Sequence, residues 1–486
     1  MKPSLLVMLA ATALSGTLAG TLGGCALGPN YHRPTAPVEQ HFTASDGWTP
    51  ATPADQIQKG AWWQVYNDSV LDGLEQKVVI NNQNVAAAEA VVRQSEAGVV
   101  EQQAALWPTL GLTFGANRSG GGTSGSGTSG SGTTGSGTTT NGNRFSAGAD
   151  AAWTLDIWGK VRREIEQAKA QAQASKADLA NATLSAQATL AITYFELRAT
   201  EEQQKLLQTT VDNYQKALTL TQNQYNSGVA QRSDVLQAQS QLATTKAQLQ
   251  DLALTRGQYL HAIAVLIGTT PDQVDIPAGA LASVVPVVPT GVPSQLLQRR
   301  PDIAASERLA AAANANIGIA ETAFFPTLSL SATDTASSST LSKLFAAHNS
   351  TWSVGADVAE DLIYFPALSA GVKSAKAGYD EAVAQYRETV LVAFQGTEDN
   401  LLALRVLEGE QGLREEAEHE ARQAEQIELN DYKAGTVAYT SVITAQNTTL
   451  TAMISTLTVR QSRLVASATL IEDLGGGWDD AQLKGK

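Results

Sequence analysis

The sequence predicts an internally duplicated membrane protein of mixed α and β structure. Three observations predict it: two copies of one unit, long helical segments without proline or glycine, and strands that alternate strictly between apolar and polar residues. A net charge of -14, with 16% charged residues, is typical of a poor nucleic-acid binder, because phosphates need a basic face. Aromatic residues make up 6% of the chain, which favours long helices over compact cores.

Residues 1–24 are predicted to be a targeting segment. Lys2 gives a positive start, an apolar run follows from Leu5, and the run ends in small residues. Cys25 comes directly after a Leu-Gly-Gly motif and is the single cysteine of the chain, which favours a bacterial lipoprotein signal. Its sulfur would carry a diacylglycerol, and two or three acyl chains give stable anchoring. The alternative is an ordinary signal peptide with a cysteine nearby.

The two copies follow one another in the same order. Their motifs are 218 residues apart before a Gly/Ser/Thr-rich loop at 119–142 and 207 residues apart after it. A length change in that loop accounts for the difference, since loops tolerate insertions. The clearest pairs are Trp107-Pro-Thr-Leu with Phe325-Pro-Thr-Leu, Phe145-Ser-Ala-Gly-Ala-Asp150 with Trp352-Ser-Val-Gly-Ala-Asp357, and Tyr225-Asn-Ser-Gly228 with Tyr432-Lys-Ala-Gly435.

In the first copy we expect a short helix over about 69–106, a long helix over about 161–226 and a second short helix over about 233–267. Pro108 ends the first, and the long helix contains neither proline nor glycine. About 66 residues of helix span roughly 100 Å, about the length of two short helices laid end to end. Mostly small residues, from Ile165 to Ala186, repeat at alternating spacings of three and four, which indicates a coiled-coil seam.

Two strands are predicted in each copy, over 108–117 and 144–153 and again near 327–332 and 352–358. In the first strand Leu110, Leu112 and Phe114 share one face, while threonine and glycine take the other. Such alternation over about ten residues is typical of an outer-membrane β-barrel, although a half-buried soluble sheet alternates too. The predicted membrane-interface aromatics are Trp107, Trp153, Trp158, Phe325 and Trp352.

Four strands are too few to close a barrel in lipid, where open edges leave backbone groups unpaired. We therefore expect the chain to pool strands with copies of itself, and three chains would give about twelve. No segment after the first 25 residues has the roughly 18 consecutive apolar residues of a membrane helix.

No catalytic, metal or cofactor site is predicted. One cysteine excludes an internal disulfide, and none of the five histidines pairs with another at metal-ligand spacing. The G-x-G-x-x-G match at 125–130 lies in the low-complexity loop and no helix follows it, so it does not indicate a nucleotide site.

Several motifs resemble the TolC-like outer-membrane efflux proteins, and most closely their OprM-like (NodT-type) lipoprotein branch. These motifs are Cys25-Ala-Leu-Gly-Pro-Asn-Tyr-His-Arg-Pro34, Trp62-Trp63-Gln-Val-Tyr-Asn-Asp68, Trp153-Thr-Leu-Asp-Ile-Trp-Gly-Lys160 and Arg299-Arg-Pro-Asp-Ile303. The resemblance implies a homotrimer, with a twelve-stranded barrel in the outer membrane that continues into a long periplasmic α-helical barrel. It implies a passive exit duct for small molecules such as drugs, served by a periplasmic adaptor protein and an inner-membrane pump of the resistance-nodulation-division (RND) type.

The targeting segment, the two copies and the resemblance together divide the chain. They predict a signal peptide over 1–24, a lipid anchor and equatorial segment over 25–68 and a first repeat over 69–270. A Pro-rich linker over 271–293, a second repeat over 294–474 and a tail over 475–486 follow.

In the family the periplasmic tip is shut by contacts between neighbouring helix turns. The matching residues are Asp234 and Tyr432, and a hydrogen bond between them is the expected gate contact. The alternative reading is a helix-terminal charge for Asp234 and simple packing for Tyr432. The turns expected to contact the adaptor hold Gly228, Val229, Gly435 and Thr436.

The sequence departs from the family pattern near the tip. Val437 replaces an expected arginine, and Ser441 and Thr444 replace two aspartates that often form an acidic ring. We therefore expect a less charged gate. Two rivals stay open: an exit channel of a type I protein secretion system, and a lipid-anchored coiled-coil scaffold without a pore.

Overall fold

The computed structural model describes residues 26–37, 61–120, 142–286, 299–360 and 364–478. The chain divides into two compact units, and each contains parts of both sequence copies. Unit 1 comprises residues 1–33, 95–172 and 309–382, and unit 2 comprises residues 34–94, 173–308 and 383–486. Cys25, most of the Gly/Ser/Thr-rich loop and the tail after residue 478 lie outside the described residues.

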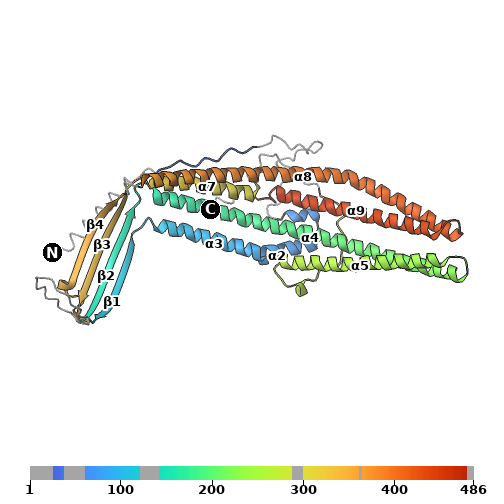
Figure 1. The fold of residues 1–486 in the computed structure, drawn as a ribbon, viewed down its shortest axis with the longest axis horizontal. Helices are drawn as coiled ribbons and strands as arrows, with labels where there is room; N and C mark the ends of the chain where they lie inside the picture. Colours follow the sequence, from blue (N-terminus) through green and yellow to red (C-terminus); the bar gives the residue numbers. More distant parts are fainter. Residues whose placement is uncertain (1–25, 38–60, 121–141, 287–298, 361–363, 479–486) are drawn as a thin grey trace, which may run out of the picture. The chain divides into compact units, whose positions relative to one another are not determined.

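The helices and strands follow the same order in both halves of the chain (Figure 1). The first half has α3 (Gln83–Ala104), β1 (Thr109–Ser119), β2 (Gly142–Leu155), α4 (Lys160–Asn226) and α5 (Arg232–Leu266). The second half has α7 (Pro301–Thr322), β3 (Thr327–Ser338), β4 (Ser350–Ala359), α8 (Phe365–Ala434) and α9 (Tyr439–Asp473). The 3-10 helix η2 (Trp62–Tyr66) and α2 (Ser69–Asn81) precede them, and the short turns η3 (Pro271–Gln273), η4 (Leu341–Lys343) and η5 (Ala347–Asn349) lie in connections.

The long helices match the sequence prediction closely. The helix α4 runs for 67 residues, and its predicted start at residue 161 differs from the observed start by one. The helix α8 runs for 70 residues although it contains Pro366. Pro366 is the second residue of the helix, a position at which proline removes no intrahelical hydrogen bond. None of the helices in the described ranges is both long enough and apolar enough to span a membrane.

The predicted short helix over 69–106 is wrong in one respect, because the structure has two helices there. Asn82 has an extended backbone and separates α2 from α3. Its side-chain oxygen accepts hydrogen bonds from the backbone N–H groups of Asn84 (2.9 Å) and Val85 (3.2 Å), which caps α3. Its side-chain amide donates to the carbonyl oxygen of Leu266 at 2.8 Å, so a contact with α5 holds the break in place.

Unit 1 contains one antiparallel sheet in the order β1-β2-β3-β4. The register aligns Leu110 with Ala151, Ala151 with Ala332 and Ala332 with Val354, so these residues share one face of the sheet. Thr113, Gly148, Thr335 and Thr351 are aligned in the same way on the other face. The apolar and polar faces that alternation predicts are therefore confirmed, and the strands β2 and β3 join the two halves of the chain.

The apolar face of the sheet is exposed in the single chain. Leu110, Leu112 and Phe114 of β1 are 75%, 68% and 76% exposed, and Trp352, Val354 and Val358 of β4 are at least 70% exposed. A soluble protein rarely exposes a contiguous apolar surface of this kind. The surface therefore requires an apolar environment.

The main core of the molecule lies in unit 2, where η2 and α2 pack against α4, α5, α8 and α9. Trp62 is 1% exposed, and the hydroxyl of Tyr66 is 2.7 Å from the hydroxyl of Ser467 in α9. The ring of Tyr66 also lies 4.8 Å from that of Phe195 in α4, measured between centroids. The Trp-Trp motif of the sequence is thus a structural element that fastens the N-terminal segment to the helices.

A carboxyl group is buried on the same face of α2. Glu75 is 0% exposed and follows Leu71 by one helical turn. Neither of its carboxyl oxygens has a hydrogen-bond partner in the described part of the chain. Burial, followed by the nearby charge of Asp72, raises the pKa of Glu75 to about 9. This group is therefore protonated at neutral pH.

The segment that joins the two halves is fastened to α4 by charged groups. Arg198 donates to the carbonyl oxygen of Pro277 at 2.7 Å, and the backbone N–H of Gly279 donates to Glu201 at 3.0 Å. Arg198 and Glu201 themselves form an ion pair at 2.8 Å, and Arg256 of α5 is 2.9 Å from the same carboxylate. The inter-repeat segment thus covers a buried ionic cluster in unit 2.

Candidate functional site

The two helix-hairpin turns, which were predicted to meet an adaptor protein, have the same backbone structure. Gly228 follows α4 and Gly435 follows α8, and both have a φ of 77°. The backbone N–H of Val229 donates to the carbonyl oxygen of Gln224 at 2.8 Å, and that of Thr436 donates to Asp431 at 3.0 Å. These bonds form the usual glycine-terminated end of a helix. All four predicted turn residues (Gly228, Val229, Gly435 and Thr436) are exposed.

A compact cluster of side chains fastens the two hairpins to each other just behind these turns. It consists of Ala238, Tyr432, Tyr439 and Val442, packed against residues of α4 and α8. The rings of Tyr432 and Tyr439 lie 5.1 Å apart, measured between centroids, and are 8% and 3% exposed. We call these four residues the tip cluster. It joins α5, α8 and α9 into one packed end.

Within this chain the hydroxyl of Tyr432 does not donate the expected hydrogen bond to Asp234. The hydroxyl of Tyr432 donates to the side-chain oxygen of Gln224 in α4 at 2.6 Å. The carboxylate of Asp234 accepts instead from the backbone N–H of Gln231 at 3.2 Å, in a capping box at the start of α5. Asp234 is the third residue of α5, and its carboxylate accepts from the backbone N–H of Gln231 at the start of that helix. Tyr432 is bonded to α4 instead.

Burial raises the pKa of Tyr439 to about 12, and the neighbouring Tyr432, Tyr214 and the charge of Asp234 add to the effect. Tyr439 therefore stays uncharged at physiological pH. Val437, in place of the family's arginine, packs against the cluster, and the neighbouring Ser441 and Thr444 also carry no charge. Packing and the neutral hydrogen bond from Tyr432 to Gln224 thus join the hairpins at the tip cluster, and the less charged gate stays a prediction.

Four of the five predicted interface aromatics lie at the helix-side end of the sheet. Trp153 donates its indole N–H to the carbonyl oxygen of Leu106 at 3.1 Å, and Trp107 is 74% exposed. Trp158 stacks on Phe325 at 4.7 Å, measured between centroids. Trp352 lies toward the other end, since it is aligned with Asp334 whereas Thr327, at the helix-side end, is aligned with Ala359. Aromatic side chains therefore stand at both ends of the exposed apolar face.

Sequence reasoning missed several residues of the site. Gln224 and Tyr439 had no motif to mark them, and their roles depend on contacts between separate helices. In the described ranges, no group of three or more His, Cys, Asp or Glu side chains is arranged to hold a metal ion. The lipidation candidate Cys25 lies outside the described residues.

A family model for outer membrane efflux proteins matches residues 74–269 and 292–476, which is most of the chain. The chain belongs to the outer membrane efflux protein family. It is 30% identical over 460 residues to the pyoverdine export outer membrane protein OpmQ of Pseudomonas aeruginosa, covering 94% of this chain and 95% of OpmQ. It is also 30% identical to the toluene efflux pump outer membrane protein TtgC of Pseudomonas putida, covering 94% and 93% of the two chains.

The fold of this efflux protein also matches solved channels. The structure of the outer-membrane channel OprN matches with a TM-score of 0.82 and 27% identity, covering 93% of this chain and all of that one. The predicted family, the outer-membrane location and the role in efflux are therefore confirmed. The relatives are named for export, efflux or a channel.

Proposed function

We propose that this efflux protein is the exit duct of a tripartite pump, built from three copies of the chain. Each chain contributes the four-stranded sheet, and three sheets close a twelve-stranded barrel that continues into a helical barrel in the periplasm. One observation carries the proposal: β1 and β4 are edge strands whose apolar residues are exposed. In lipid those edges must pair, and the nearest partner of matching structure is a second copy of the chain.

The duct does no chemistry in this proposal and conducts small molecules passively. A periplasmic adaptor and an inner-membrane RND-type pump are the proposed partners, and the name of TtgC as a pump outer membrane protein supports them. The exposed turns at Gly228 and Gly435 are the proposed adaptor contacts. Trp107, Trp153, Trp158 and Phe325 are assigned to one membrane interface and Trp352 to the other.

The proposed anchor is Cys25, lipidated after removal of residues 1–24, and residues 25–68 link it to the equatorial region of the duct. The proposed repeats are 69–270 and 294–474, joined by the linker 271–293 and followed by the tail 475–486. The repeated order of helices and strands supports this division.

The molar mass of the detergent-extracted protein, measured by light scattering and corrected for bound detergent, tests the assembly. We expect the mass of three chains and single-channel currents after reconstitution into a planar bilayer. A stable monomer without conductance would instead support the lipid-anchored scaffold. A trimer whose cells secrete a protein and expel no small molecules would support the type I secretion channel.

Asp234 and Tyr432 are proposed to keep the tip closed, with the tip cluster as their support. Asp234 would act through the start of α5, which its carboxylate caps. In Asp234→Ala we expect larger single-channel currents and more antibiotic uptake than in wild type. Currents and uptake equal to those of wild type would remove Asp234 from the gate.

A further inference from the structure

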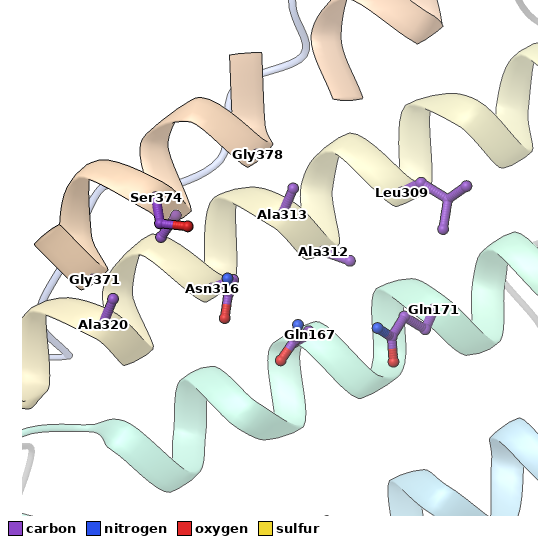
Figure 2. Close-up of a pocket in the computed structure, with 11 residues that line it drawn as sticks. Gln167, Gln171, Leu309, Ala312, Ala313, Asn316, Ala320, Gly371, Ser374 and Gly378 are labelled. Carbon is purple, nitrogen blue, oxygen red and sulfur yellow. The ribbon is translucent and has the colours of Figure 1, made fainter. Parts of the chain in front are cut away.

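A cavity of about 540 Å³ lies in unit 1, where α7 runs between α4 and α8. Figure 2 shows Gln167 and Gln171 of α4 and Asn316 of α7 on one side of it, and Ser374 of α8 on the other. Ala312, Ala313 and Ala320 of α7 supply an apolar surface between them. Among the described residues that line this cavity, none is charged.

A second cavity of about 280 Å³ continues the first along α4 toward α3. Gln167, Gln171 and Asn316 line both cavities, and Gln102 of α3 and Glu164 of α4 extend the second. Together they form one groove, which we call the amide groove. Its combined size lies in the range of known small-molecule sites, which are mostly apolar with a few well-placed polar groups.

The segment that follows Cys25 in the sequence, which we call the anchor segment, shows which side of α7 carries the amide groove. Pro29 in that segment accepts a hydrogen bond from Asn314 of α7 at 3.0 Å, and Leu27 accepts one from Arg163 of α4 at 2.9 Å. Asn316 follows Asn314 by two residues and so projects about 200° away round the helix. The amide groove therefore lies on the side of α7 opposite the anchor segment.

The anchor segment must lie outside the wall, because the acyl chains at Cys25 enter the lipid that surrounds it. The opposite face, which carries the amide groove, is then the inner face of the duct. This step rests on the proposed function, since it needs both the lipid anchor and the closed wall.

We propose that the amide groove is a binding site inside the duct for neutral, hydrogen-bonding organic molecules in transit. Carboxamides both donate and accept hydrogen bonds, so Gln167, Gln171 and Asn316 suit hydroxyl, carbonyl and amide groups of a ligand. The alanines of α7 suit the apolar faces of its rings. An anion would lose hydration without meeting a positive charge among the residues that line the groove.

Two glycines of α8 in the lining of the groove have room for a side chain. A Cβ atom added at Gly371 or Gly378 of α8 would meet no atom within 4 Å, so a larger side chain there enters open space. Gly409 of the same helix has equally open surroundings but does not line the groove, which makes Gly409→Leu a matched control.

The first experiment measures binding to the purified full-length protein in detergent by equilibrium dialysis. The probes are di-N-acetylchitobiose, which is neutral and carries two amides, and its 6-O-sulfate, which has the same rings and amides but a negative charge. We expect saturable binding of the neutral probe at millimolar concentration, at least tenfold weaker binding of the charged probe, and at least tenfold weaker binding of the neutral probe to Gly378→Leu and to Gln167→Ala/Asn316→Ala. Gly409→Leu should bind as wild type does.

Equal binding of the neutral probe to wild type and Gly378→Leu, or no saturable binding to wild type, would overturn the site. A change in the oligomer mass of Gly378→Leu would show that the groove holds another copy of the chain, which also overturns it. A second experiment tests the face. In Gly378→Cys, whose Cys25 sulfur is blocked by the lipid, a bulky methanethiosulfonate reagent should lower single-channel conductance by tens of per cent, and unchanged conductance places the groove outside the duct.

Failure of this inference is distinguishable from failure of the proposed function. The mass and conductance of the wild-type protein judge the duct without any probe. If wild type is a conducting trimer and the probe still does not bind, only the amide groove loses its role.

Discussion

The two hairpins of the chain contain the same ion pair in very different surroundings. In the first hairpin Glu201 of α4 pairs with Arg256 of α5, and its side chain is 3% exposed. In the second hairpin the equivalent Glu408 of α8 pairs with Arg463 of α9 at 3.2 Å, and its side chain is 73% exposed. Each residue of the second pair lies 207 residues after its equivalent in the first, which is the spacing of the two copies. One pair has a buried glutamate, and the other has an exposed one.

The difference comes from the segment that joins the repeats. Pro277 and Gly279 lie against Arg198 and Glu201 and supply hydrogen bonds from the backbone. A buried charge pair without such extra bonds would lose more in hydration than it gains in attraction. The same ion pair therefore differs in burial between the two copies because the inter-repeat segment lies over one of them and not over the other.

The largest expected effect separates these two glutamates. Glu201→Gln leaves the buried Arg198 without its charge partner and should lower the free energy of unfolding by about 3–5 kcal/mol. Glu408→Gln should lower it by less than about 0.5 kcal/mol, because its pair is exposed to water. Thermal unfolding of both variants in detergent, followed by circular dichroism, measures the difference. Equal shifts of the midpoint would contradict the comparison.

A second large effect belongs to Glu75, whose pKa of about 9 lies above the ordinary value of 4.5. The unfolded chain releases this proton first, so folding is most favourable below pH 4.5 and loses stability as pH rises toward 9. At pH 7 the loss is about 3 kcal/mol. Glu75→Gln should raise the unfolding midpoint at pH 7 and flatten its dependence on pH between 5 and 9, relative to wild type measured in the same buffers. A variant with the pH profile of wild type would show that the carboxyl is not protonated in the fold.

The two glycines that end α4 and α8 should lose the same amount of stability when substituted, unlike the two glutamates. Gly228 and Gly435 share a φ of 77° and open surroundings, so the cost of a side chain is conformational alone. Gly228→Ala and Gly435→Ala should each lower the free energy of unfolding by roughly 1–2 kcal/mol. Thermal midpoints that differ widely between the two variants would reveal a contact at one turn and not at the other.

The smallest expected effect distinguishes two equivalent tyrosines. Tyr432 donates to Gln224 and is 8% exposed, whereas its equivalent Tyr225 is 40% exposed. Tyr432→Phe leaves the oxygen of Gln224 without this donor and should cost about 1 kcal/mol. Tyr225→Phe should cost almost nothing. Single-channel recordings of the two variants test whether the same contact also steadies the tip, and identical records would limit Tyr432 to a role in stability.

Much of the fold could be predicted from the sequence because the relevant signals are local. Alternation placed all four strands and their two faces, and the lack of proline and glycine placed α4 within one residue. The break at Asn82 was missed, since asparagine caps a helix only where its neighbours allow it, and here Leu266 of α5 fixes its amide. The partner of Tyr432 was missed for the same reason, because Gln224 belongs to another helix and no spacing reveals it.

The pairing of β2 with β3 has a consequence for how the proposed trimer assembles. A ring of six separate half-chains would need six intermolecular seams, each formed by collision. In this chain every second seam, between β2 and β3, forms between strands tethered in one molecule, where the effective concentration is raised and the correct neighbour is always present. Duplication therefore leaves three seams to diffusion instead of six, and it ensures that the two kinds of hairpin alternate round the ring.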